Sequence, residues 1–295
     1  MAGILNLQLL AAGLRLSAPI LLAALGGLFT ERVGIFNVAL EAMMLVGAFA
    51  GVASSYWAAS AWAGVLGAIL AGLLLASIFA LFTLKLKSDP IMTGIALNLV
   101  VGGLTVLLMQ VIFDVRGMFH STRIGLLPQI NYSSPILSRL LGGNNVIFYM
   151  AFILVPVLYI LFYHSRLGLR IRAVGQYAPA AEAVGVNPQR YQLISILTSG
   201  ILSGLAGAWL SLSSLGMFSE NMTAGRGFIA LAAIFFGRST PVGILLASVF
   251  FGLAEAFAIR LQGVGVPSQL VLMIPYVATV LSLALSARRW QDSTS

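Results

Sequence analysis

Residues 61–84 read AWAGVLGAILAGLLLASIFALFTL, a continuous run without one charged side chain. A helix needs about twenty such residues to cross the hydrocarbon core of a bilayer, which is roughly 30 Å thick. Strands of a membrane barrel instead alternate apolar and polar residues over about ten positions, and this run does not alternate. The stretch therefore predicts a transmembrane helix.

Composition extends this prediction to the whole chain. Hydrophobic residues make up 60% and charged residues 8% of the 295 residues, and the mean hydropathy is +1.02. A water-soluble protein carries about a quarter charged residues, so the apolar excess has to face lipid. Candidate spans are Leu7–Phe29, Phe36–Tyr56, Ala61–Leu84, Ile91–Phe113, Val146–Tyr163, Leu193–Leu215, Val242–Ile259 and Gln269–Ser286.

One apolar element is too short to cross. Phe228–Phe236 has about half the required length and follows the flexible segment Thr223–Gly227, which predicts a half-helix that begins inside the membrane. Gly34–Leu40 opens another apolar element after a similar Arg-Gly break, so the two halves form a faint pseudo-repeat. We therefore expect an all-α integral membrane protein, a single transmembrane domain over residues 1–295 with about 8–10 transmembrane helices, some of them interrupted.

Basic residues gather in three short stretches between spans, namely Lys85 with Lys87, then Arg166, Arg170, Arg172 and Arg190, and finally Arg288 with Arg289. Counting spans places all three on one side if the short element Phe228–Phe236 is counted as a crossing, and the positive-inside rule predicts that side to be cytoplasmic. This distribution explains the net charge of +8 without nucleic acid as a partner.

The usual signatures of catalysis are missing from the sequence. It has no Cys, no His-Glu-x-x-His zinc motif and no Gly-x-x-x-x-Gly-Lys-Ser/Thr phosphate-binding loop. We expect neither a metal nor a cofactor on this chain, and a membrane enzyme is a remote alternative.

The most informative polar residues are Asn37 and Glu41, which are four positions apart. On a helix they would share one face, and an acid inside an apolar span costs roughly 2.5–3.5 kcal/mol on insertion scales. Either they line a polar path and accept hydrogen bonds from a solute, or Glu41 is a structural acid bonded to neighbouring backbone. The adjacent Glu31 and Arg32 are interpreted as interfacial anchors.

Three further residues are candidates for the path. Asn98 lies mid-span and either contacts a ligand or bonds to an adjacent helix. Phe36 and Phe228 follow the two breaks and offer rings that can stack on a flat ligand, although a lipid-facing or core position is the more common role for such rings. Glu255 and Arg260 are five apart, which disfavours a helical ion pair, so Glu255 is also interpreted as an anchor.

Residues 164–192 form the longest loop predicted on the cytoplasmic side, and its residues suggest where a helix begins and ends. Pro179 suits the first turn of a helix, Glu182 would complement the dipole there, and Gly185 can close the C-terminus. The loop therefore predicts one or two helical turns that dock on a partner, with a plain connection as the alternative.

Taken in order along the chain, these blocks resemble the permeases of bacterial nucleoside and simple-sugar ABC importers, relatives of ribose and branched-chain amino-acid permeases. The resemblance covers roughly residues 30–285. It rests on Glu31-Arg32-x-Gly-x-x-Asn37-x-x-x-Glu41, Gly94–Asn98, Gly168–Gly185, Ile229–Gly237 and Pro275-Tyr276.

The resemblance implies a permease that takes up nucleosides across the bacterial inner membrane by alternating access. It also implies a separate ATPase that binds ATP and Mg²⁺, a second similar permease and an extracytoplasmic substrate-binding protein. In that scheme the path residues are Phe36, Asn37, Glu41, Asn98 and Phe228, and the ATPase-coupling residues are Gly175, Pro179, Ala181, Glu182, Gly185 and Asn187. A ribose, sugar or branched-chain amino-acid permease is the alternative, followed by a stand-alone carrier or channel.

Overall fold

The computed structural model of the chain describes residues 7–130, 142–213 and 216–262. Seven helices within these residues are long and apolar enough to cross a membrane. They are α1 (Leu7–Arg32), α2 (Leu40–Ala58), α3 (Ala61–Ala80) with its π-helical continuation η1 (Leu81–Lys85), α4 (Pro90–Phe113), α6 (Val146–His164), α9 (Pro188–Leu212) and α11 (Pro241–Gln262). The all-α, multi-pass prediction is confirmed. The predicted span Gln269–Ser286 lies outside the described residues.

Shorter elements complete the described chain. They are the helices α7 (Arg166–Gln176), α8 (Ala178–Ala183) and α10 (Arg226–Phe236), and the strands β1 (Met118–His120), β2 (Gln129–Ile130), β3 (Asn144–Asn145) and β4 (Met217–Ser219). β1 pairs antiparallel with β4, and β2 pairs antiparallel with β3. The 11-residue α10 confirms the predicted short helix over Phe228–Phe236.

Some of the long helices begin after a polar residue that caps the helix and is followed directly by proline. The side chain of Asp89 accepts from Met92 N at 2.9 Å ahead of Pro90, and Asn187 accepts from Arg190 N at 3.2 Å ahead of Pro188. Each cap satisfies a backbone donor that has no partner inside the helix, and proline needs none at that position.

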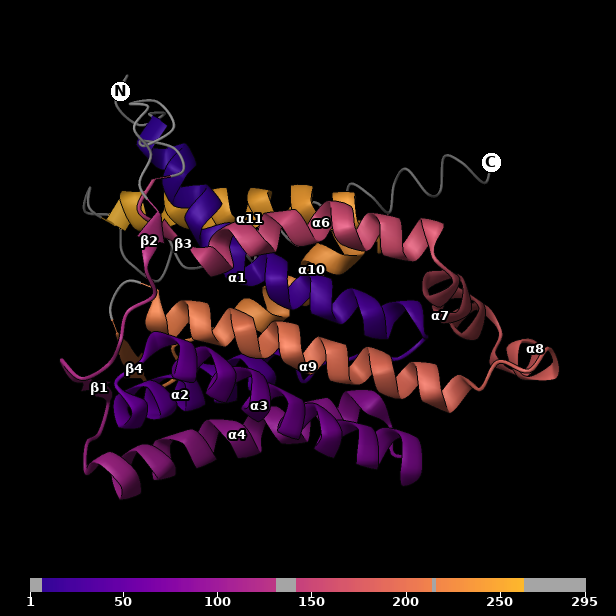
Figure 1. The fold of residues 1–295 in the computed structure, drawn as a ribbon, viewed down its shortest axis with the longest axis horizontal. Coiled ribbons are helices and arrows are strands. Elements are labelled where there is room, and N and C mark those ends of the chain that lie inside the picture. The colour runs from indigo at the N-terminus through magenta and orange to yellow at the C-terminus, as the bar shows by residue number, and fades with distance from the viewer. Residues whose placement is uncertain (1–6, 131–141, 214–215, 263–295) are drawn as a thin grey trace.

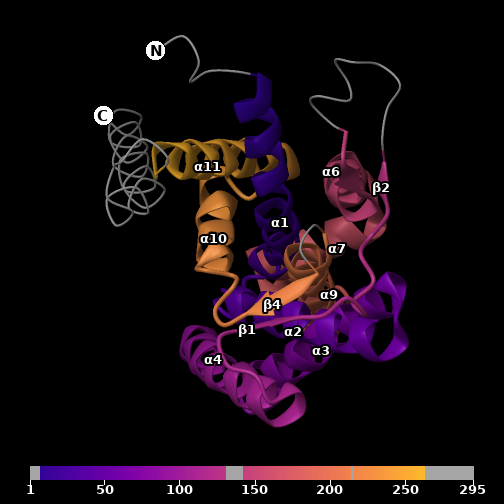
Figure 2. The same cartoon turned by 90° about the vertical axis from the view of Figure 1, so that its left-hand side faces the viewer.

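The bundle is organised around α9, which contacts α1, α2 and α3. Viewed along the long axis, α1, α6 and α11 lie on one side of α9 and α2, α3 and α4 on the other (Figure 2). Small residues allow the closest crossings: Gly47 of α2 lies against Gly204 of α9, and Gly72 of α3 lies against Gly200. Because attraction between helices in lipid depends on such contact, these glycines hold α2 and α3 against α9.

The two ends of the bundle differ in character. All four strands lie at one end, here called the strand end, and α7 and α8 lie at the other, here called the α7 end (Figure 1). α4 finishes at Phe113, just before β1, so its first residue and the preceding Lys85 and Lys87 lie at the α7 end. The first two basic clusters therefore share one side, as predicted. The third lies outside the described residues.

Two expectations about local structure are wrong. The segment before α8 is not loop but α7, because Ile171 and Val174 are buried while Arg166 and Arg170 remain exposed, as on an amphipathic helix. In addition, Glu182 is the fifth residue of six in α8, so it lies in the last turn and cannot complement the dipole of the first. Arg15 lies inside the continuous α1, and its guanidinium donates to Asn144 Oδ1 at 2.8 Å and to the Gly142 carbonyl at 3.1 Å.

Candidate functional site

The segment between α1 and α2 is a break in the helical path, as the pseudo-repeat predicted. Gly34 has φ +80°, and Asn37 Oδ1 accepts from Ala39 N at 3.0 Å, a local turn that competes with helix. Asn37 Nδ2 donates to Ser199 Oγ of α9 at 3.1 Å. The helix begins only at Leu40, so the prediction that Asn37 and Glu41 share a helix face is wrong.

Asn98 of α4 holds this break in place. Its Nδ2 donates to the Val38 carbonyl at 3.1 Å and its Oδ1 accepts from Ala42 N at 2.9 Å. Of the two alternatives for Asn98, the structure shows the bond to a neighbouring element. A role in contacting solute stays a prediction.

Glu41 connects the two breaks across the molecule. Its Oε1 accepts from Gly225 N at 2.9 Å and its Oε2 accepts from Gly227 N at 2.6 Å. Gly225 has φ +80° and α10 carries no side-chain cap of its own, so Glu41 supplies the acceptors for the start of α10. A carboxylate also complements the positive end of the helix dipole. The structure thus shows Glu41 bonded to neighbouring backbone, with a place on the path left as a prediction.

The position of the N-terminus of α10 along the bundle follows from the length of this helix. Eleven residues rise about 16 Å, roughly half of a hydrocarbon core. The C-terminal end of α10 lies at the α7 end, because the carbonyl of Ser239 accepts from Arg32 Nη2. The N-terminus with Glu41 therefore lies about halfway across the bundle.

The two candidate phenylalanines are not brought together. The ring of Phe36 packs against Phe235 near the C-terminal end of α10, in a tilted arrangement with 5.5 Å between the ring centroids. Phe228 is seven residues earlier on the same helix, two turns nearer its N-terminus, and remains 46% exposed. Phe36 and Phe228 therefore do not form a ring clamp in this conformation, and Phe228 is the more exposed of the two.

Sequence reasoning missed an ion pair at the N-terminus of α10. Arg226 Nη2 bonds to Glu255 Oε1 of α11, and the two side chains are only 17% and 18% exposed. Glu255 is thus not the interfacial anchor that the sequence analysis expected. The sequence did contain an indication of this pair, because Arg226 and Glu255 each interrupt an apolar segment. The two residues are on different helices, however, so their spacing in the sequence does not reveal the contact.

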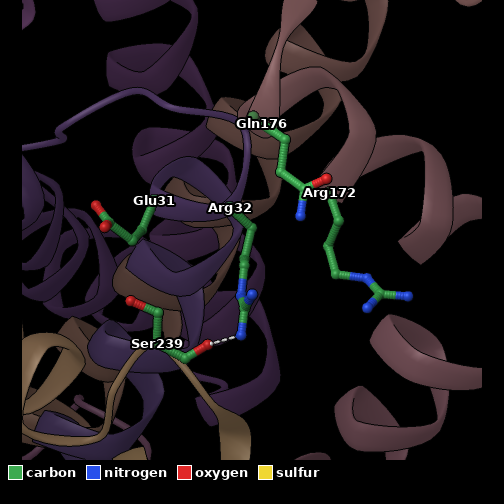
Figure 3. Close-up of a pocket in the computed structure, with 6 residues that line it drawn as sticks. Glu31, Arg32, Arg172, Gln176 and Ser239 are labelled. Atoms are coloured by element: carbon green, nitrogen blue, oxygen red, sulfur yellow. Dashed lines mark hydrogen bonds between the residues drawn. The ribbon is translucent and has the colours of Figure 1, made fainter. Parts of the chain in front are cut away.

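At the α7 end, a pocket of about 210 Å³ is lined by Glu31, Arg32, Arg172, Gly175, Gln176 and Ser239. Figure 3 shows the Arg32 side chain between those of Glu31 and Arg172, reaching the backbone of Ser239. Arg32 also donates to Tyr163 OH at 3.2 Å, and the Arg172 guanidinium lies 5.2 Å above the Tyr163 ring. Arg32 is therefore a connector of three elements, beyond the anchor predicted for it.

Gly175 makes the contact between α7 and α1. Its Cα faces the backbone carbonyl of Arg32 so closely that a Cβ would overlap it. The predicted coupling segment is thereby linked to the end of α10 in two steps, first through Gly175 to Arg32 and then through Arg32 to Ser239.

The remaining coupling candidates surround α8. Pro179 is its second residue, Ala181 is buried, Glu182 is exposed and Gly185 closes the turn with φ +82°. The prediction of a short helix here is confirmed. Docking of an ATPase on it stays a prediction, as does the coupling role of Asn187, which caps α9.

Comparisons with known proteins agree with this architecture. The family model described as "Branched-chain amino acid transport system / permease component" matches residues 9–285. The chain is 34% identical to the nucleoside ABC transporter permease protein NupC of Lactococcus lactis, over 95% of this chain and 92% of that one. It is 31% identical to the guanosine ABC transporter permease protein NupQ of Bacillus subtilis, over 90% and 88%.

A third relative has a different solute in its name. TsgC13 of Haloferax volcanii, named provisionally as a glucose ABC transporter permease protein, is 33% identical over 88% of this chain and 78% of its own. Among solved structures, an ABC transporter in an inward-facing conformation, provisionally of the metal-chelate type, matches with a TM-score of 0.55 and 18% identity. That match covers 94% of this chain and 86% of the other. At that identity the match supports the fold alone.

Proposed function

The chain belongs to the family of branched-chain amino acid transport system permease components, and we propose that it is the membrane-spanning permease subunit of an ABC importer for nucleosides. The observation that carries the substrate class is the similarity to NupC and NupQ along nearly the whole chain, since both relatives are named for nucleosides. TsgC13 favours a sugar as the second candidate.

The proposed assembly contains partners that supply what this chain lacks. A separate ATPase binds ATP and Mg²⁺ and docks on α8, while this chain carries out no catalysis and binds no cofactor. A second, similar permease completes the path as a heterodimer, and an extracytoplasmic binding protein delivers the solute at the strand end. In a bacterial inner membrane the α7 end then faces the cytoplasm. The position of the two basic clusters at this end supports that orientation.

The contacts at the α7 end support a mechanism of alternating access. Closure of the ATPase moves α8, and α7 moves with it because the two helices are joined at Tyr177. Gly175 passes this movement to the end of α1, and Arg32 passes it to the turn after α10. Because α10 begins at mid-depth, a shift of its α7 end changes the geometry where solute crosses.

Competitive uptake tests the proposal. Cells with and without this chain, otherwise carrying the complete transporter, are given labelled guanosine, uridine, ribose and leucine. We expect deletion of the chain to abolish uptake of the two nucleosides and to leave ribose and leucine unchanged. Loss confined to ribose or to leucine would assign the chain to a sugar or an amino-acid importer instead. Uptake by the purified chain alone in liposomes would establish a stand-alone carrier.

A further inference from the structure

The N-terminal end of α10 holds two acids with different bonding. Both carboxylate oxygens of Glu41 are occupied by backbone N–H groups, at 2.9 Å and 2.6 Å. Glu255 uses only Oε1, for Arg226, and its Oε2 is buried with no hydrogen-bond partner among the described residues. Glu41 is therefore committed to the fold, whereas Glu255 retains bonding capacity.

Two neighbouring groups share this property. Arg226 Nε and Thr223 Oγ1 are likewise buried without a partner in the described part of the chain, and Thr223 is fully buried. Arg226 Nη1 reaches back to the carbonyls of Met222 at 3.1 Å and Thr223 at 3.4 Å, so the three groups belong to one turn and the helix beside it. One carboxylate oxygen, one guanidinium N–H and one hydroxyl without partners thus lie on this turn and on the helix paired with it.

Stability does not account for such an arrangement. Burying two charges costs several kcal/mol for each ion, and the attraction between them compensates only when the remaining lone pairs and protons are bonded. Unpartnered polar atoms at membrane depth add a further penalty, and ionisable residues there usually mark a solute pathway. The cluster therefore fits a ligand that supplies the missing bonds.

The available groups indicate the chemistry of that ligand. A carboxylate oxygen accepts hydroxyl protons, and two adjacent hydroxyls of a sugar ring offer two of them. Arg226 and Glu255 balance each other in charge, which suits a neutral solute rich in hydroxyls. A zwitterionic amino acid would fit the two charges in a different way, with its carboxylate on Arg226.

We propose that Glu255, Arg226 and Thr223 form the sugar-recognising part of the solute path, with Glu255 accepting from the 2′ and 3′ hydroxyls of a nucleoside. This inference rests on the proposed nucleoside transport. When the site is empty, the Arg226–Glu255 pair joins the start of α10 to α11. A bound diol draws Glu255 away from Arg226, so that solute loosens the contact between the two helices and couples occupancy to movement of α10.

The test compares a ribonucleoside with its 2′,3′-dideoxy analogue. Initial uptake rates over a range of concentrations are measured for both in cells that carry the complete transporter, with the wild-type chain or with Glu255→Gln. For each strain, the preference is the uptake rate of the ribonucleoside divided by that of its dideoxy analogue. The binding protein is the same in both strains, so its own preference cancels when the preference of the wild type is divided by that of Glu255→Gln. A hydrogen bond to a charged acceptor corresponds to a preference of about tenfold or more. We expect Glu255→Gln to reduce the ribonucleoside preference by about that factor.

The matched control is Glu220→Gln. Glu220 is an exposed acid at the strand end that accepts from Gly117 N at 2.8 Å, and we expect its replacement to leave the preference unchanged. A second variant exchanges the charges, Arg226→Glu with Glu255→Arg. A purely structural ion pair survives this exchange, whereas the proposed site does not, so the double variant is expected to insert in the membrane and to lose the preference.

Three outcomes would overturn the inference. The first is an unchanged preference in Glu255→Gln, and the second is a wild-type preference in the exchanged pair. The third is leucine competing with the nucleoside in the wild type but not in Glu255→Gln, which would assign the pair to a zwitterion. If the wild-type cells take up neither nucleoside, the proposed function itself fails, and that result is separate from the other three.

Discussion

The two ends of α10 are held in different ways. At the α7 end the contacts involve backbone: the Gly175 Cα lies against the Arg32 carbonyl, and Arg32 reaches the Ser239 carbonyl. At the N-terminus the contacts involve buried charge, with Glu41 on two amides and Arg226 on Glu255. On the proposed mechanism, the contacts at the α7 end pass on movement whatever the solute, whereas the Arg226–Glu255 pair distinguishes one solute from another. We therefore expect coupling to depend on one end of this short helix and selectivity on the other.

The largest effect is expected from Glu41→Ala, at the N-terminal end of α10. The amides of Gly225 and Gly227 would lose their acceptors at membrane depth, and each buried unsatisfied donor costs about 1–3 kcal/mol. We expect uptake to fall to background, and the melting temperature of the purified chain in detergent to drop. Glu41→Gln, which retains an acceptor oxygen, is expected to lie in between, and Glu220→Ala serves as the exposed control.

This prediction separates the two roles that the sequence left open for Glu41. A cap lowers stability for every solute alike. A wild-type melting temperature combined with an altered choice among nucleosides would instead place the Glu41 carboxylate on the path.

The next largest effect is expected at the other end of α10, from Gly175→Ala. The added methyl group would meet the Arg32 backbone, which cannot yield as a side chain can, and overpacking of this kind costs about 1–3 kcal/mol. We expect α7 to shift and uptake to fall by about tenfold, while ATP hydrolysis by the assembled transporter persists. The control is Gly102→Ala, because a Cβ there meets nothing within 4 Å. Loss of hydrolysis together with uptake would show that Gly175 serves assembly rather than coupling.

A smaller effect is expected at α8 itself. Gly185→Leu introduces a side chain at φ +82°, which costs about 1–2 kcal/mol locally and distorts the end of a six-residue helix. Combined with Glu182→Leu, it is expected to reduce uptake severalfold without changing membrane insertion, if α8 docks on the ATPase. Gly117→Leu is a matched control, since Gly117 has the same φ and open surroundings at the strand end. Equal losses from Gly185 and Gly117 would contradict the coupling assignment.

Local patterns in the sequence were sufficient for the elements that these predictions use. The apolar run after Thr223–Gly227 identified the half-helix, and Pro179 with Gly185 identified the short helix α8. Both signals act within a few residues, where proline and glycine limit the backbone directly. The amphipathic spacing of Ile171 and Val174 carried the same kind of information for α7, which the loop interpretation overlooked.

Contacts between distant residues were beyond such patterns. The acceptor of the Gly225 amide is Glu41, 184 positions away, and the partner of Glu255 lies on another helix. The sequence indicated that an acid at membrane depth needs a role, but it could not choose between solute and backbone, because either satisfies the carboxylate. Asn37 was assigned to a helix for a related reason, since its bond to Ala39 N belongs to a turn that precedes α2, and spacing alone does not reveal that turn.

The smallest effect is expected from Phe228, which lies next to the charged cluster at the start of α10. Its ring is 46% exposed, so Phe228→Leu is expected to change the free energy of unfolding by less than about 1 kcal/mol. If the ring stacks on a nucleobase in the path, its loss removes part of an interaction worth about 1–3 kcal/mol per base, and the KM for uridine rises about fivefold. Phe250→Leu on α11 is the control, since that ring is 50% exposed and the KM is expected to stay unchanged. Equal KM values for both variants would make Phe228 an ordinary lipid-facing ring and leave recognition at this end of α10 to its polar groups.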